Sequence, residues 1–186
     1  PSNNQKNKEN NLMSKTGRPV WAMEFKITDP EGKTIKKDHT QVGNIWVKGP
    51  TVINKYYKER DFCVDSEGWF DTGDVSTISP DGYMRIVDRS KDVIKSGGEW
   101  ISSIDLENTA LGCPGVLEAC VVGVAHEKWD ERPLLFVVKN SDECTKESVL
   151  EYLSDKVAKW WLPDDVIFID ELPHGATGKL LSLIHI

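Results

Sequence analysis

The sequence predicts an α+β fold in which a β-rich first part precedes a small unit that mixes strands and helices. Short apolar runs separated by Gly, Pro and Asp turns continue up to Val87, a pattern typical of antiparallel strands. Two longer apolar runs, 116–125 and 134–138, suit strands that are covered on both faces. Between residues 145 and 160, apolar residues recur with the spacing of one helix face.

The β-rich part is predicted from its turns. Residues 1–16 are rich in Asn, Lys and Ser without periodicity, so we expect a flexible segment there. A hairpin is predicted over 21–35, with its turn at 29–32, and a further strand over 43–48. Residues 51–60 are expected to form one or two helical turns.

The next hairpin carries two candidate binding residues. Its strands, 75–78 and 83–87, are joined by Ser79-Pro80-Asp81-Gly82, a sequence typical of a type I turn. Asp74 directly precedes the first strand and Arg89 closely follows the second. A carboxylate can accept hydrogen bonds from the hydroxyls of ribose, and a guanidinium suits sugar or phosphate oxygens. Because antiparallel strands bring their outer ends together, both side chains are expected to face the same space; taken alone, each equally fits a plain turn residue or a solvated charge.

The second part begins with a small hairpin over 92–101. Its Ser96-Gly97-Gly98 turn permits positive φ and close approach of a ligand to the backbone, although a plain hairpin turn has the same sequence. Ser102 lies three residues before Asp105, which predicts the start of a helix that continues to Leu111.

A second helix and a last strand complete this unit. The helix is predicted over 145–160 and is expected to end before Pro163, and the strand follows at 165–169. Trp160 and Trp161 are expected to be packing residues, because no basic groove accompanies them. The order strand, helix, strand, strand, helix, strand predicts a small sheet with helices beside it.

Composition excludes several classes of function. The net charge of −7 and the absence of a basic stripe argue against a nucleic-acid binder. The four cysteines have no C-x-x-C spacing and no histidine partners, so we expect no metal site and reduced thiols in a cytoplasmic protein. No apolar run is long enough to span a bilayer.

Several motifs in a fixed order resemble those of one family. They are GWFDTGD at 68–74, DRSKDVIKSGGEWIS at 88–102, EKWDERPL at 127–134 and ATGKL at 176–180. Together they resemble the late core motifs of the adenylate-forming (AMP-binding) superfamily, which contains acyl-CoA synthetases, luciferases and peptide-synthetase adenylation domains. The residues within these motifs are most similar to those of the medium- and long-chain fatty-acid–CoA ligases.

The resemblance implies a domain organisation. Residues 17–90 would be the C-terminal part of the large AMP-binding N-terminal domain, which is β-rich and barrel-like there. Residues 91–180 would be the small mobile C-terminal domain, with a central three-stranded sheet and flanking helices. The family's phosphate loop and magnesium motif are not in the sequence, so we expect a C-terminal fragment whose Mg²⁺ ligands lie elsewhere. The apolar ending at 181–186, LSLIHI, is expected to be a non-native tail.

The resemblance also implies a reaction. An ATP-dependent acid–thiol ligase adenylates a carboxylic acid, here a fatty acid, and transfers the acyl group to CoA. Asp74 and Arg89 would bind the ribose of ATP or AMP. Lys179 would be the catalytic residue, because two anions must approach each other and a cation is needed where negative charge grows.

The second half-reaction implies a rotation of the small domain. Lys91 falls at the position of the family's hinge, and a hinge needs only to absorb a change in φ and ψ. Gly97 and Gly98 would line the CoA tunnel through their backbone, with Lys95 and Glu99 nearby. Solvated charges on a hairpin are the simpler explanation for those last two residues.

Other readings remain open from the sequence. A peptide-synthetase adenylation domain or a luciferase-like oxygenase shares these motifs and differs in the acceptor. A noncatalytic α+β interaction module is a further possibility. The chain alone is expected to be inactive and to need the missing N-terminal part of the same enzyme as its partner.

Overall fold

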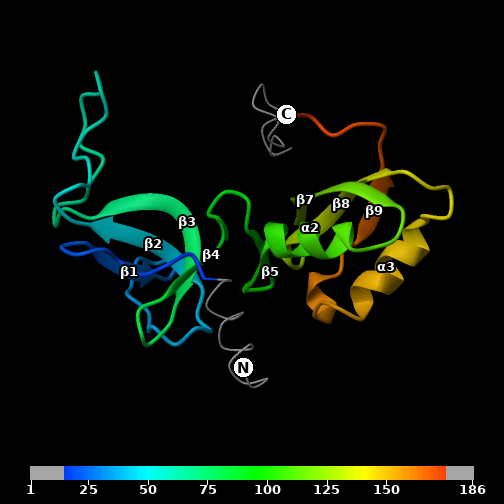
Figure 1. Ribbon diagram of the computed structural model, residues 1–186, viewed down its shortest axis with the longest axis horizontal. Helices are drawn as coiled ribbons and strands as arrows, with labels where there is room; N and C mark the ends of the chain where they lie inside the picture. The colour runs from blue at the N-terminus through cyan, green and yellow to red at the C-terminus, as the bar shows by residue number, and fades with distance from the viewer. Residues whose placement is uncertain (1–14, 175–186) are drawn as a thin grey trace, which may run out of the picture. The chain divides into compact units, whose positions relative to one another are not determined.

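The computed structural model describes residues 15–174. Residues 1–14 of the segment 1–16 predicted to be flexible lie outside the described residues, as do Lys179 and the tail at 181–186. At the end of that segment, the Thr16 N–H donates to Met84 O at 2.8 Å. Two compact units divide the chain, Pro1–Lys91 and Asp92–Ile186 (Figure 1).

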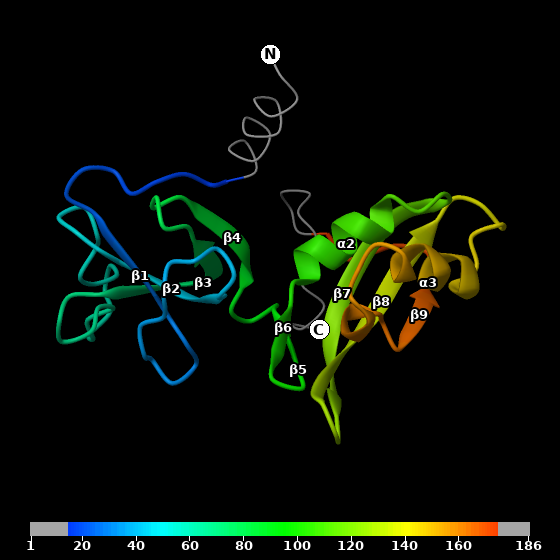
Figure 2. The ribbon, with the colours of Figure 1, turned by 90° about the horizontal axis from the view of Figure 1, so that it is seen from below.

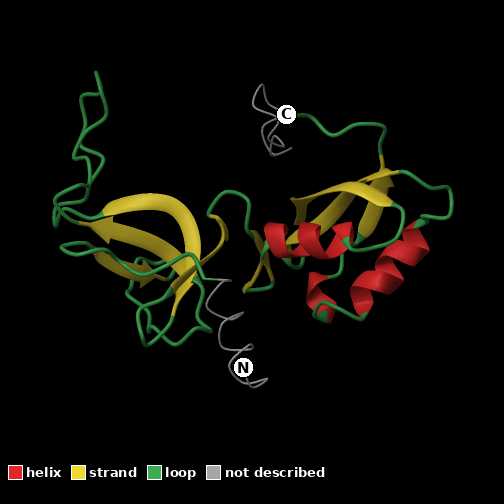
Figure 3. Cartoon of the chain, viewed as in Figure 1, coloured by secondary structure: helices red, strands yellow, loops and turns green. Residues whose placement is uncertain are grey.

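The described part of the first unit is an antiparallel sheet in which each strand pairs with the next one along the chain (Figure 3). The strands are β1 Glu24–Thr28, β2 Gly43–Lys48, β3 Phe70–Ile78 and β4 Met84–Arg89. Ile27, Ile45 and Ile78 are buried on one face and form its core. Among residues 15–91, β1 and β4 are the outermost strands, with a short bridge from Gly17 to Met84 on the outer side of β4, so this part is an open sheet and not a closed barrel.

The turn-based predictions for this unit are confirmed in part. Strand β2 has the predicted bounds, and the β3–β4 hairpin turns where the Ser79–Gly82 sequence predicts, with the Gly82 N–H donating to Ser79 O at 2.8 Å. The turn predicted at 29–32 forms, with the Gly32 N–H donating to Asp29 O at 3.0 Å and the Ile35 N–H donating to Ile27 O at 2.9 Å, but residues 33–35 add only an isolated bridge between Thr28 and Thr34 and no full strand.

The helical turns predicted over 51–60 are wrong. The chain there forms a series of turns, in which the Glu59 N–H donates to Tyr56 O. Lys58 has φ +64°, a left-handed conformation that a right-handed helix cannot contain. Tyr57 is 88% exposed, so its ring gives a helix no apolar face to bury.

Within residues 92–174, the second unit contains one five-stranded sheet, two α-helices and a short 3₁₀ helix. Its elements are β5 Ile94–Ser96, β6 Glu99–Ile101, α2 Ser103–Leu111, β7 Val116–His126, β8 Asp130–Lys139, α3 Lys146–Ser154, η1 Lys159–Trp161 and β9 Asp165–Phe168. The sheet order is β6-β5-β8-β7, with β9 parallel to β8. The α+β class is confirmed, but the sheet exceeds the predicted three strands because the small hairpin joins it where Ser96 pairs with Asp130.

The second unit buries both faces of its sheet, as the continuous apolar runs predict. One face shares a core with α2 and α3 (Figure 2), in which Leu106, Leu135 and Leu153 are fully buried. On the other face Cys120 and Leu172 lie in a smaller cluster, because the chain after β9 returns across the sheet. Each fully buried leucine contributes about 1.5–3 kcal/mol to stability.

The first helix agrees with its prediction and the second is shorter. Ser102 caps α2, and its hydroxyl accepts the Asp105 N–H at 3.1 Å. Helix α3 ends at Ser154, not near residue 160, because Ala158 is extended with ψ 149° and only then does η1 begin. Trp161 packs against the core as predicted, but the prediction is wrong for Trp160, which is 53% exposed.

Candidate functional site

The β3–β4 hairpin brings the two predicted ribose-binding residues opposite each other. Asp74 and Arg89 are cross-strand partners, and the next pair is Val75 with Asp88. Directly opposed residues of an antiparallel pair project from the same face of the sheet. Asp74 is half-buried and Arg89 is exposed, and neither side chain forms a hydrogen bond or ion pair within residues 15–174.

The backbone around this pair is held by a set of short hydrogen bonds. Gly73 has φ +71°, and its carbonyl accepts the Ser90 N–H at 2.9 Å. The Thr72 hydroxyl donates to Ile45 O at 3.0 Å and accepts the Asp74 N–H at 3.2 Å. These bonds join β3 to β2 and to the residue after β4, so the acid and the guanidinium are held by a constrained backbone.

A second arrangement surrounds the glycine turn between β5 and β6. Gly97 and Gly98 have φ +60° and +85°, the left-handed pair that a tight two-residue hairpin turn requires. The Gly97 N–H donates to Trp129 O at 2.8 Å, and the Lys95 N–H donates to Glu131 Oε2 at 2.9 Å. The turn is therefore held by the β7–β8 connection.

Trp129 also explains why residue 97 is a glycine. A Cβ placed at Gly97 would lie 2.8 Å from Cε3 of the Trp129 ring, whereas one at Gly98 would meet no atom within 4 Å. The indole thus packs directly on the Gly97 backbone, and the backbone of Gly98 stays open.

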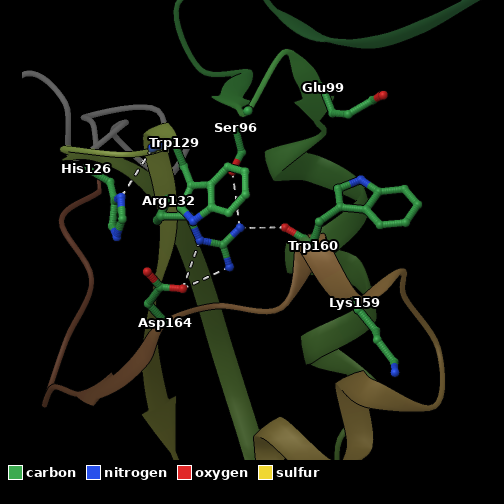
Figure 4. Close-up of a pocket in the computed structure, with 9 residues that line it drawn as sticks. Ser96, Glu99, His126, Trp129, Arg132, Lys159, Trp160 and Asp164 are labelled. Carbon is green, nitrogen blue, oxygen red and sulfur yellow. Dashed lines mark hydrogen bonds and ion pairs between the residues drawn. The ribbon is translucent and has the colours of Figure 1, made fainter.

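A pocket of about 520 Å³ lies beside this turn (Figure 4). It combines two partly exposed indoles, two cationic side chains, two acidic ones, a histidine and the glycine turn. Its lining residues are Ser96, Gly97, Glu99, His126, Trp129, Arg132, Lys159, Trp160 and Asp164. Such a wall offers aromatic faces for a flat ring and positive charge for an anion.

Charge in this pocket is divided between a paired and an unpaired cation. Arg132 is bound to Asp164, with Nε and Nη2 at 2.9 and 2.8 Å from Oδ1. Lys159 makes no side-chain hydrogen bond or ion pair with any residue from 15 to 174. Nδ1 of His126 accepts the backbone N–H groups of Lys128 and Trp129, which leaves Nε2 as its donor toward a ligand.

The predicted site residues fall into separate places. Gly97 and Glu99 line the pocket, and Gly98 is exposed beside it, whereas the exposed Lys95 does not line it and contributes its backbone N–H to Glu131. Lys91 is the last residue of the first unit.

Sequence reasoning missed the other pocket residues. Trp129 and Arg132 belong to the motif EKWDERPL, which carried the family resemblance but was assigned no chemistry. Their proximity to Gly97 depends on the pairing of β5 with β8, and no spacing in the sequence reports that pairing. Trp160 was assigned to packing because its basic neighbour, Lys159, was not recognised as part of a site.

Three general properties follow from the part of the chain that the structure describes. Residues 15–174 contain no group of three or more His, Cys, Asp or Glu side chains that could hold a metal ion. Within the same residues, no helix has both the length and the apolar character needed to cross a membrane. All four cysteines are free thiols.

The sequence of the chain is similar to those of known proteins. Residues 105–179 match the model of the AMP-binding enzyme C-terminal domain. The chain is 49% identical to the 3-methylmercaptopropionyl-CoA ligase of Ruegeria lacuscaerulensis, over 94% of this chain and 32% of that protein. It is 47% identical to the medium-chain-fatty-acid–CoA ligase of Ectopseudomonas oleovorans, over 92% of this chain and 32% of that protein.

Solved structures agree with this. The o-succinylbenzoate CoA synthetase of Bacillus subtilis, in complex with its acyl-adenylate intermediate, has a TM-score of 0.81 at 29% identity, over 94% of this chain and 36% of that one. ATP-bound MatB from Rhodopseudomonas palustris has a TM-score of 0.77 at 31% identity, over 90% of this chain and 34% of that one. The chain spans about a third of the length of the curated relatives it matches. Residues 105–179 are therefore an AMP-binding enzyme C-terminal domain, and more than nine-tenths of the chain is similar to about a third of these CoA ligases.

Proposed function

We propose that this chain is part of an ATP-dependent ligase that activates a carboxylic acid as its acyl-adenylate and transfers the acyl group to CoA. The observation that supports this most strongly is the 47–49% identity to proteins named as CoA ligases over more than nine-tenths of the chain. Asp74 and Arg89 lie on one face of a constrained hairpin, and among residues 15–174 neither side chain has a hydrogen-bond or ion-pair partner, so both can bind a ribose.

The first half-reaction divides between the sheet of the first unit and Lys179. A carboxylate oxygen attacks the α-phosphorus of ATP, and pyrophosphate leaves. Asp74 accepts hydrogen bonds from the ribose hydroxyls, and Arg89 donates to ribose or phosphate oxygens. Lys179 supplies positive charge where the attacking carboxylate meets the phosphate. Mg²⁺ would neutralise the phosphates, with ligands from outside residues 15–174.

The second half-reaction uses the glycine turn. The sulfur of CoA attacks the carbonyl carbon of the acyl-adenylate, and AMP leaves. The open backbone at Gly98 lets the pantetheine arm pass close to the chain, and Gly97 lines the pocket. The pocket's indoles and Lys159 suit the nucleotide end of CoA, which carries a flat base and phosphates. Lys91 is the hinge about which the small domain rotates between the two half-reactions. The rotation takes Lys179 away from the reacting groups and brings the glycine turn to them.

The acid is proposed to be a medium- or long-chain fatty acid. A medium-chain and a long-chain fatty-acid–CoA ligase are 47% and 42% identical to the chain. The ligase from Ruegeria, named for 3-methylmercaptopropionyl-CoA, is equally similar and makes a short thioether acid the alternative substrate.

Joining the full chain to the rest of a relative tests the proposal. The chain would replace its matched 172-residue counterpart in the Ectopseudomonas ligase, and the graft would be assayed for acid-dependent exchange of pyrophosphate into ATP and for acyl-CoA formation. We expect both activities, and we expect CoA, not an amine, to accept the acyl group. A folded graft with neither activity, beside an active parent enzyme, would contradict the proposal.

A further inference from the structure

Arg132 lies near the start of β8 and connects two segments that are far apart in the sequence, Ser96 and residues 160–164. Nη1 donates to Ser96 Oγ at 3.2 Å and to Trp160 O at 2.7 Å, and Nη2 donates to Leu162 O at 2.8 Å. With Nε bound to Asp164 at 2.9 Å, all three nitrogens are engaged (Figure 4). The side chain is only 15% exposed.

Because its N–H groups are already hydrogen-bonded within the protein, Arg132 differs from an arginine that binds a ligand. A guanidinium that binds phosphate must offer free N–H groups, and these are already directed to a hydroxyl, two carbonyls and a carboxylate. Lys159, three residues before Leu162, remains the uncommitted cation of the pocket among the described residues. Arg132 therefore acts on the walls of the pocket and not on its contents.

Arg132 connects the two sides of the pocket that are proposed to contact CoA. Ser96 directly precedes the glycine turn, and the carbonyls of Trp160 and Leu162 belong to the segment that presents the second indole and Lys159. The bond to Trp160 O is exposed and the bonds to Leu162 O and Ser96 Oγ are part-buried. A buried carbonyl that loses its donor costs about 1–3 kcal/mol, and the Leu162 carbonyl would incur part of this cost, so the segment would shift without the guanidinium.

We infer that Arg132 is a positioning residue: it holds the glycine turn and residues 160–162 in a fixed arrangement. In this way it sets the affinity of the enzyme for CoA in the second half-reaction. The inference rests on the proposed function and adds to it a residue outside the predicted site. The acceptors lie in three directions around one planar fork, so a lysine, with one nitrogen, cannot replace it.

The graft into the Ectopseudomonas ligase separates this role from charge and from general stability. In Arg132→Ala and Arg132→Lys, we expect the KM for CoA to rise about tenfold to a hundredfold, with pyrophosphate exchange unchanged. Lys159→Ala should also raise this KM, and Lys159→Arg should restore it. Lys139→Ala, at the other end of β8, is the matched control and should leave both half-reactions unchanged.

Hydrogen exchange supplies a readout that does not need CoA. Arg132→Ala should speed exchange of the Gly97 and Leu162 amides by at least about tenfold, the effect of losing about 1.4 kcal/mol, and leave α2 unchanged. Equal losses in both half-reactions, or an Arg132→Lys variant that behaves as wild type, would overturn the inference. An unmodified graft that exchanges pyrophosphate but makes no thioester would instead overturn the proposed CoA chemistry, which is a separate result.

Discussion

Replacing Gly97 by alanine should destabilise the second unit far more than the same change at Gly98. Both residues have positive φ, so both variants incur the left-handed backbone cost of about 1–2 kcal/mol. Only at residue 97 does the new methyl carbon meet the Trp129 ring, at 2.8 Å, and overpacking of this kind costs about 1–3 kcal/mol more. We therefore expect about 2–5 kcal/mol for Gly97→Ala and about 1–2 kcal/mol for Gly98→Ala.

A double-mutant cycle isolates the contact. Urea unfolding of the full chain, followed by circular dichroism, gives the free energies, and native-state hydrogen exchange of the β5 and β6 amides assigns the loss to this hairpin. In the Trp129→Ala background the difference between the two alanine variants should disappear. Equal destabilisation in the wild-type background, or a difference that survives removal of the indole, would refute the steric reasoning.

Three further predictions concern the caps, the charges and the ribose site. Thr145→Ala should cost about 1 kcal/mol in urea unfolding, because it removes the Oγ1 that accepts the Ser148 N–H in the α3 capping box, and Thr145→Ser should cost little. The hydrogen bond from Lys146 lowers the pKa of Asp165, so its stabilisation is present above the ordinary aspartate pKa of about 3.9 and lost as the pH falls below it; the Tm difference between wild type and Lys146→Ala should be seen at neutral pH and vanish in acid. In the graft, Asp74→Ala should raise the KM for ATP about tenfold, whereas an unchanged KM, or the same rise in Asp81→Ala, would count against the ribose assignment.

Local chemistry made part of the fold predictable. Strand β2, the Ser79–Gly82 turn and the Ser102 cap depend on residues that are neighbours in sequence, so turn and capping preferences are sufficient to place them. The same holds for Asp74 and Arg89, since a short hairpin leaves little choice of register. Their role in binding ribose stays a prediction.

The failures come from contacts that no local pattern reports. Helix α3 was expected to continue toward Trp160 because Val157 keeps the helical spacing, yet Val157 packs on the core from a turn after the helix has ended. The pocket depends on one pairing between β5 and β8, at Ser96 and Asp130, which sets Trp129 against the glycine turn.

Separate measurement of the two half-reactions in the Lys179→Ala graft tests whether Lys179 serves adenylation and the glycine turn serves thioester formation. We expect pyrophosphate exchange to fall by a factor of at least about a hundred, the loss typical of one group that stabilises transition-state charge. Thioester formation from preformed acyl-adenylate and CoA should stay close to that of the unmodified graft. Equal losses in the two steps would contradict the assignment of Lys179 to adenylation and of the glycine turn to CoA.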